Sequence, residues 1–206
     1  MKVSEKKHIR CFVAVELPRE LKARIERETA GLRRSRTDVK WVPAENMHFT
    51  LKFLGGVPEE DIPALIGVLE EAVRGQKPFE IEVFGAGVFP GARSPRVFWI
   101  GAKDQESRFK DLARAVEDAV EHFGPGYPRE ARGFTPHLTL GRLREGARLK
   151  GGAAMEDARE LSDEVSTLKD VLFGKIKLEK ISLMQSVLGP KGSTYSRLAE
   201  IRFGEG

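Results

Sequence analysis

One short pattern occurs twice in this chain and constrains its fold more than any other feature. The tetrapeptides His48-Phe49-Thr50-Leu51 and His137-Leu138-Thr139-Leu140 both read histidine, apolar residue, threonine, leucine, and 89 positions separate them. A chain of this composition would contain two such matches by chance in roughly 6 of 100,000 cases. The repeat therefore predicts two related strands, one in each half of the fold.

The alternation inside each tetrapeptide predicts where its side chains point. On a strand, residues i and i+2 lie on the same face, so each histidine projects together with its threonine. The apolar residues between them turn the other way, toward a core. If a pseudo-twofold axis relates the two strands, two imidazoles and two hydroxyls face one another across a groove.

Hydrophobic periodicity and turn residues predict the remaining elements. Strands are expected at residues 10–17, 40–42, 47–54, 79–84, 96–101, 137–143, 175–188 and 194–203. Helices are expected at residues 19–34, 62–73, 109–123 and 154–172, with loops at 85–95 and 124–136. Strands joined by short turns favour antiparallel pairing, so the predicted class is α+β. Two lobes with pseudo-twofold antiparallel sheets and flanking helices would enclose an active-site groove.

Composition and the absence of linkers predict the organisation of the chain. Hydrophobic residues make up 40% of it, which excludes a disordered chain, and the net charge of +4 is compatible with a polyanionic substrate. Residues 1–206 are expected to form a single domain of two tightly packed lobes, with residues 1–8 mobile. We expect a cytoplasmic monomer without an obligate protein partner, because neither a signal peptide nor a membrane-spanning run is visible.

The paired histidines and threonines suit phosphodiester chemistry that needs neither a metal nor another cofactor. Near neutral pH a neutral imidazole can accept a proton and an imidazolium can donate one. The hydroxyls of Thr50 and Thr139 can donate to phosphoryl oxygens, and Arg142 adds positive charge five residues after His137. Neither tetrapeptide contains Asp, Glu or Cys, so no metal site is predicted.

These residues are similar to the two-histidine (2H) phosphoesterase superfamily. They resemble most closely its RNA 2′,3′-cyclic phosphodiesterases, which are also called 2′-5′ RNA ligases. The resemblance runs from residue 9 to residue 203. It is carried by residues 10–18, 46–55 and 136–142 and by a C-terminal hairpin that contains Tyr195.

The resemblance implies hydrolysis of an RNA 2′,3′-cyclic phosphate end to a 2′-phosphomonoester. It implies that His48 is the proton donor and His137 the proton acceptor, with Thr50, Thr139 and Arg142 binding the phosphate. Microscopic reversibility extends this to ATP-independent 2′-5′ RNA ligation. The two motifs are nearly symmetric, so the sequence alone leaves the acid and base assignment open.

Several residues outside the motifs are candidates for contacting RNA. Arg129 and Arg132 precede the second motif, and Lys191 lies at the tip of the C-terminal hairpin. Their charge suits a phosphate backbone, although ordinary solvated surface charge explains them equally well. Tyr195 and Phe12 are candidates for stacking a base, but the apolar strand around Phe12 favours a core position.

Two other functions remain open. The same chemistry could act on a small cyclic nucleotide or a 2′-5′ oligonucleotide, which a comparison of nucleotide and oligomer turnover would reveal. The groove could also belong to a non-catalytic RNA-binding module, whose affinity would fall with salt and which would release no product. Pure binding has no need of two facing imidazoles, which favours the enzyme.

Overall fold

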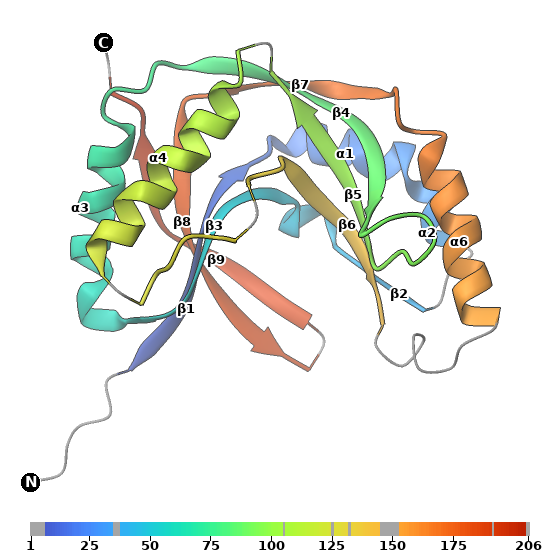
Figure 1. Cartoon of the computed structure of the whole chain (residues 1–206), viewed down its shortest axis with the longest axis horizontal. Coiled ribbons are helices and arrows are strands. Elements are labelled where there is room, and N and C mark those ends of the chain that lie inside the picture. The colour runs from blue at the N-terminus through green and yellow to red at the C-terminus, as the bar shows by residue number, and fades with distance from the viewer. Residues whose placement is uncertain are drawn as a thin grey trace, which may run out of the picture.

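The computed structural model describes residues 7–34, 38–104, 106–124, 126–131, 133–144, 153–190 and 192–204. One antiparallel sheet runs through the molecule as an arch, and the helices pack along its flanks (Figure 1). The strands are β1 (His8–Glu16), β2 (Val39–Trp41), β3 (His48–Pro58), β4 (Phe79–Phe89), β5 (Val97–Lys103), β6 (His137–Leu143), β7 (Leu172–Leu178), β8 (Lys180–Gly189) and β9 (Gly192–Arg202). The helices are α1 (Arg19–Glu28), α2 (Ala30–Arg34), α3 (Ile62–Val73), α4 (Arg108–Phe123) and α6 (Ala153–Ser166), with short turns η1 (Ala44–Asn46) and η2 (Glu59–Asp61). The predicted α+β class is confirmed.

The sheet has two halves that meet between β3 and β6. Its strand order is β7-β4-β5-β6-β3-β1-β8-β9, and β2 also pairs with β6. The halves are joined where Phe49 of β3 pairs with Leu138 of β6. We call β1, β3, β8 and β9 the first lobe, and β2, β4, β5, β6 and β7 the second. The lobes are therefore parts of one sheet, whereas the sequence predicted a separate sheet for each.

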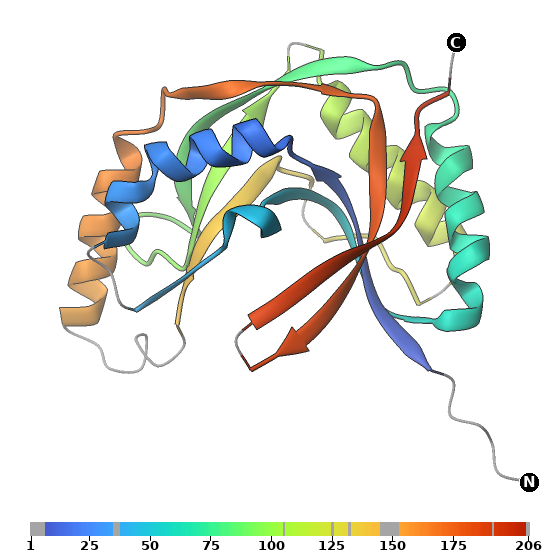
Figure 2. The same ribbon diagram turned by 180° about the vertical axis from the view of Figure 1, so that it is seen from behind.

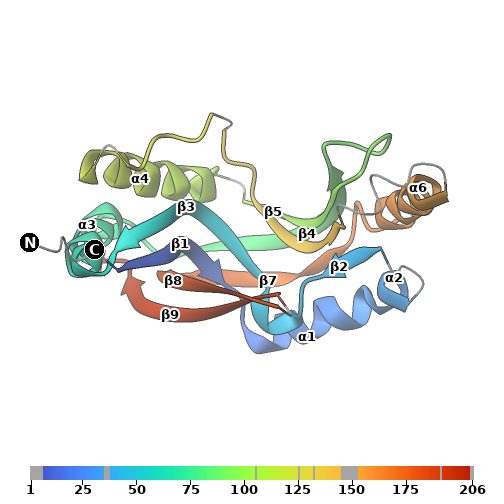
Figure 3. The ribbon, with the colours of Figure 1, turned by 90° about the horizontal axis from the view of Figure 1, so that it is seen from below.

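Different helices cover the two lobes. Helices α3 and α4 pack against the first lobe, and α1, α2 and α6 accompany the second (Figure 3). Helix α4 shows the usual amphipathic spacing, and its apolar stripe is buried; the stripe consists of Phe109, Leu112, Ala113, Val116 and Val120. The β8–β9 hairpin projects from the first lobe into the opening of the arch (Figure 2). Within the described ranges, no helix has the length and apolar character needed to cross a bilayer.

Two predicted elements near the C-terminus have different boundaries in the structure. The helix predicted over residues 154–172 ends at Ser166, because the chain from Leu172 onward pairs with β4 as strand β7. Leucines continue at helical spacing as far as Leu172, but pairing with β4 overrides that local pattern. The single strand predicted over residues 175–188 belongs to β7 and β8, which separate at Glu179.

Two further predictions are corrected in the first half of the chain. The helix predicted over residues 19–34 is divided at Thr29, whose buried hydroxyl donates to the Ile25 carbonyl at 2.8 Å. The loop predicted over residues 85–95 begins as strand, because β4 continues to residue 89. Gly87 lets that strand pass the ring of Trp99, since a Cβ there would lie 2.5 Å from the ring.

The N-terminal segment predicted to be mobile is described in part. Lys7 donates to Glu59 at 3.1 Å, and His8 is the first residue of β1. Residues 1–6 lie outside the described ranges.

Candidate active site

The repeated motifs begin the two strands that join the lobes. Strand β3 begins at His48 and strand β6 at His137, and the second residues of the motifs, Phe49 and Leu138, pair at the junction. Both of these apolar side chains are fully buried. Each histidine and threonine points away from this core, and the four side chains line one pocket of about 730 Å³. The structure thus brings together the side chains that the sequence analysis paired.

A β-bulge follows the threonine in both motifs. The register of β3 against β1 skips Leu51, and the register of β6 against β5 skips Leu140. Burial then follows the same order over six residues of both strands: half-buried, buried, half-buried, buried, buried, exposed. A bulge redirects the side chains beyond it. The fifth residue after each histidine, Phe53 or Arg142, is consequently exposed at the pocket.

Each imidazole is oriented by a backbone carbonyl two residues upstream. Nδ1 of His48 donates to the Asn46 carbonyl at 2.7 Å, and Nδ1 of His137 donates to the Thr135 carbonyl at 2.8 Å. A carbonyl oxygen can only accept, so the hydrogen in both rings lies on Nδ1. Nε2 is therefore the nitrogen of each ring that can accept or donate a proton during a reaction.

Aromatic side chains surround the two histidines differently. The ring of Phe12 stacks on His48 with 4.8 Å between centroids, and Tyr195 meets the same imidazole edge-on at 5.3 Å. His137 instead contacts Phe89 edge-on at 5.2 Å. Phe12 is only 3% exposed, so it supports the imidazole from beneath, as the apolar strand around it favoured.

Burial lowers the pKa of His48 below the ordinary value of histidine. The hydrogen bond to the Asn46 carbonyl opposes this shift by favouring the protonated ring. Two nearby charges act in opposite directions, since Lys22 lowers the pKa and Glu16 raises it. Glu16 is held in turn by Ser182 and Arg197, at 2.7 and 2.8 Å.

The remaining predicted site residues lie in different surroundings. Arg142 is exposed at the pocket, and its Nη2 donates to the Thr139 hydroxyl at 3.4 Å. Tyr195 also lines the pocket. Arg129 is paired with Asp118 and with Glu121, the latter at 2.6 Å, on the outer helix α4. Arg132 and Lys191 lie outside the described residues.

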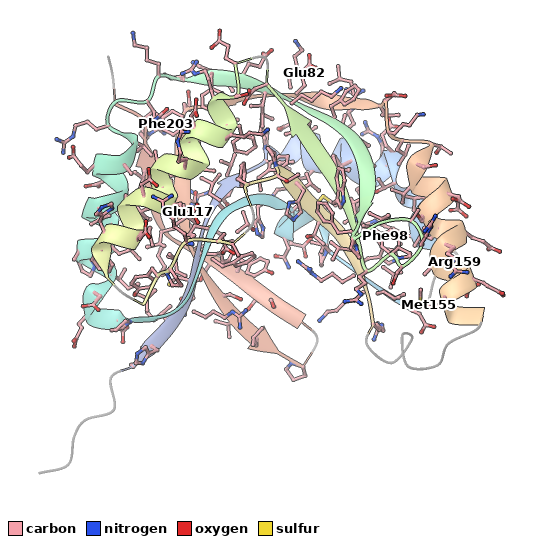
Figure 4. The ribbon with its side chains drawn as sticks, viewed as in Figure 1. Glu82, Phe98, Glu117, Met155, Arg159 and Phe203 are labelled. Carbon is pink, nitrogen blue, oxygen red and sulfur yellow. The ribbon has the colours of Figure 1, made fainter. Side chains whose placement is uncertain are left out.

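A buried lysine that the sequence analysis did not single out connects β3 to the neighbouring loop. Lys52 is 3% exposed, and its ammonium donates to the Pro128 carbonyl at 2.6 Å and to Glu117 at 3.1 Å. Glu117, labelled on α4 in Figure 4, also accepts from the backbone N–H of Glu130 at 2.6 Å. Lys52 thereby fastens the loop before β6 to the strand that carries the first motif. The feature of the sequence that could have drawn attention to Lys52 is its position two residues after Thr50.

Replacing Lys52 with methionine is expected to lower the free energy of unfolding by about 2 kcal/mol, because the half-buried Glu117 carboxylate and the Pro128 carbonyl lose their donor. Urea unfolding followed by circular dichroism measures this loss. Lys175→Met is the matched control, since Lys175 is paired with Glu80 and Glu82 on the solvent-exposed surface and contributes little. Equal shifts of the two midpoints would show that the buried contacts of Lys52 add no stability.

The fold and the paired motifs define a two-histidine phosphoesterase: each lobe supplies one imidazole and one hydroxyl to a shared pocket. The chain belongs to the LigT like phosphoesterase family, whose model matches residues 15–99 and 101–195. The resemblance inferred from the motifs is confirmed.

Comparison with individual proteins gives the same result. The chain is 36% identical over 194 residues to the RNA 2′,3′-cyclic phosphodiesterase of Methanothermobacter thermautotrophicus, which covers 94% of this chain and 98% of the relative. A crystal structure of a protein from Thermus thermophilus is similar with a TM-score of 0.76 and 31% identity, over 96% of this chain and 100% of that one. The crystal structure of E. coli LigT complexed with 3′-AMP has a TM-score of 0.73 and 26% identity, over 97% and 100% of the two chains.

Proposed function

We propose that this protein hydrolyses the 2′,3′-cyclic phosphate at the end of an RNA to a 2′-phosphomonoester. The observation that carries the proposal is the pocket in which both imidazoles, each with Nε2 available, meet both threonine hydroxyls. The RNA 2′,3′-cyclic phosphodiesterase named above supports the choice of substrate. The negative charge of the cyclic phosphate complements the positive charge of Arg142, which lines this pocket.

The reaction follows from the roles of the four side chains. Nε2 of His137 accepts a proton from water as the water oxygen bonds to phosphorus. The bond from phosphorus to the 3′ oxygen breaks, and Nε2 of His48 gives its proton to that oxygen. Thr50 and Thr139 donate to the non-bridging oxygens, where negative charge is concentrated. His137 then loses its extra proton to solvent and His48 gains a proton from solvent, so the enzyme is regenerated.

The assignment of the acid to His48 follows the resemblance of its motif to the two-histidine phosphoesterases. In its surroundings His48 differs from His137, because Phe12 stacks on its ring and Tyr195 meets the ring edge-on. The same side chains can catalyse a parallel displacement, in which the oxygen of an RNA 5′-hydroxyl takes the place of water, the bond from phosphorus to the 3′ oxygen breaks, and a 2′-5′ linkage forms. That ligation needs no ATP, because the cyclic phosphate supplies the bond energy.

The decisive experiment is incubation of the protein with an RNA that ends in a 2′,3′-cyclic phosphate, followed by identification of the product. We expect a 2′-phosphate, in EDTA as well as in magnesium. A 3′-phosphate would overturn the proposed bond cleavage, and RNA binding without product would favour the non-catalytic module. Faster turnover of a nucleoside 2′,3′-cyclic phosphate than of an oligomer would favour a small-nucleotide enzyme.

We further propose that the protein acts as a cytoplasmic monomer. Analytical sedimentation, which measures the mass of the protein in solution, tests the monomeric state.

The pH profile should respond to the two charges beside His48. Burial lowers the pKa of His48, so we expect the inflection that this ring contributes to the pH profile to lie below pH 6.5. Lys22→Met removes a positive charge that disfavours the imidazolium, so the inflection should move to higher pH. Glu16→Gln removes a negative charge that favours it, so the inflection should move to lower pH. Shifts in the same direction would contradict this electrostatic account of His48.

A further inference from the structure

The wall of the candidate active-site pocket contains an arginine that none of the steps above uses. Arg10 of β1 is exposed and lines the same pocket as the two histidines. Among the described residues, no side chain forms a hydrogen bond or an ion pair with its guanidinium. An exposed guanidinium at a pocket wall, with no carboxylate beside it, can bind an anionic group of a ligand.

The charges around the pocket leave Arg10 over. The described residues that line it include three cations, which are Arg10, Lys52 and Arg142, and a single carboxylate, Glu130. The ammonium of Lys52 is held by the contacts described above, and it also lies 3.9 Å from Glu130. A cyclic phosphate carries a single negative charge, which Arg142 complements. The charge of Arg10 therefore suits a second anionic group on the same substrate.

Arg10 and Arg142 lie on opposite sides of the motif histidines. Strands β3 and β6 run in opposite directions from the junction, where Phe49 pairs with Leu138. Arg142 lies further along β6, whereas Arg10 pairs with Gly56, further along β3. A substrate whose cyclic phosphate lies between the histidines can therefore extend toward Arg10 on the side away from Arg142.

The spacing along β1 suits the next phosphate of an RNA chain. Arg10 and Phe12 alternate on one face of β1, so Arg10 lies roughly 7 Å beyond Phe12, whose ring stacks on His48. The long arginine side chain can span part of this separation. In RNA, one ribose separates the cyclic phosphate of the terminal nucleotide from the phosphate on its 5′ side. The two phosphates are thus separated on the scale that separates the reacting centre from Arg10.

The strand opposite Arg10 leaves room for a nucleotide backbone. Arg10 and Cys11 pair with Gly56 and Gly55, neither of which has a side chain. A Cβ at Gly55 would meet no atom within 4 Å, and Gly55 itself lines the pocket. Glycine inside a strand often marks a place where a ligand approaches the backbone closely. The pocket is therefore open next to the guanidinium.

We propose that Arg10 binds the phosphodiester on the 5′ side of the terminal nucleotide, which joins that nucleotide to the rest of the RNA. This inference rests on the proposed function and adds a second phosphate subsite to the first. Such a contact carries no sequence information, because every RNA has this phosphate. It favours an RNA end over a nucleoside 2′,3′-cyclic phosphate, which has no phosphate on its 5′ side.

The test compares three substrates that share the cyclic phosphate and differ on the 5′ side. They are a nucleoside 2′,3′-cyclic phosphate, the same compound with a 5′-phosphomonoester, and a dinucleotide in which that phosphate is a diester. Arg10→Met should lower kcat/KM on the dinucleotide about 10-fold, the effect of one charged hydrogen bond, and leave the value on the nucleoside unchanged. Arg10→Lys should retain most of the activity on the dinucleotide, because lysine also binds phosphate.

Arg27→Met is the matched control for the loss of one positive charge. Arg27 is an exposed arginine in the last turn of α1 and does not line the pocket. This variant should leave kcat/KM on all three substrates unchanged. Circular dichroism checks that each variant is folded.

Each outcome bears on either the subsite or the proposed function. Equal losses of Arg10→Met on all three substrates would show that Arg10 maintains the pocket and binds no second phosphate, which overturns the inference. Unchanged turnover of the dinucleotide would overturn it as well. A loss confined to the 5′-phosphomonoester would assign the subsite to a free nucleotide in place of RNA. If the wild-type protein turned over none of the three substrates and no cyclic-phosphate RNA end, the proposed function itself would fail.

Discussion

Alanine in place of either His48 or His137 is expected to lower kcat/KM on a cyclic-phosphate RNA end by about 100- to 10,000-fold. Each variant loses one of the two proton transfers, while the hydroxyls that bind the phosphate remain. The fold should survive, because both imidazoles are only half-buried at the pocket and the core pair at the junction, Phe49 and Leu138, is untouched. Product analysis by chromatography measures the loss, and thermal unfolding followed by circular dichroism checks the fold.

A third histidine provides a matched control for these variants. His122 lies in the last turn of α4, and its Nδ1 is bonded to the Asp118 carbonyl at 2.6 Å, so it too is a ring held by the backbone. It does not line the pocket. His122→Ala should therefore retain wild-type turnover. If either motif variant kept turnover within about threefold of the wild-type protein, its imidazole would not take part in proton transfer.

The core of the site could be predicted because it depends on local alternation. Within each motif the histidine and threonine share one face whatever the rest of the chain does, and a repeat of this kind indicates two equivalent strands. The wider pocket depends on pairing with distant strands. Strict alternation would turn Phe53 toward the core, and the bulge at Leu51 reverses that direction. The register against β1 creates this bulge, and nothing in the local sequence of β3 marks it.

The misplaced boundary between helix α6 and strand β7 has a similar cause. Leu172, the first residue of β7, continues the apolar spacing of the preceding helix, so the predicted helix extended to residue 172 and the predicted strand began only at residue 175. Residues 172–178 instead pair with strand β4 in antiparallel orientation. Lys52 is a related case, since its role depends on the carbonyl of Pro128 and on Glu117, 76 and 65 positions away. Contacts over such distances cannot be read from periodicity.

A substrate with sulfur in place of the 3′ bridging oxygen should distinguish the acid from the base. A thiolate leaves without a proton because thiols are far stronger acids than sugar hydroxyls, whose leaving oxygen must be protonated. On the 2′,3′-cyclic phosphate with a bridging 3′ sulfur, His48→Ala should recover turnover to within about tenfold of the wild-type protein. Relative to wild type, the variant would then perform up to about 1,000-fold better on the sulfur substrate than on the oxygen substrate. His137→Ala should remain inactive on both substrates, because water must still lose its proton.

The released 3′ thiol can be followed with a colorimetric thiol reagent, and its appearance also tests which of the two ester bonds breaks. A thiol-free product would show cleavage at the 2′ oxygen and contradict the proposed 2′-phosphate. Recovery of His137→Ala in place of His48→Ala would exchange the two roles and make His48 the base. Recovery of neither variant would contradict the assignment of His48 as the acid.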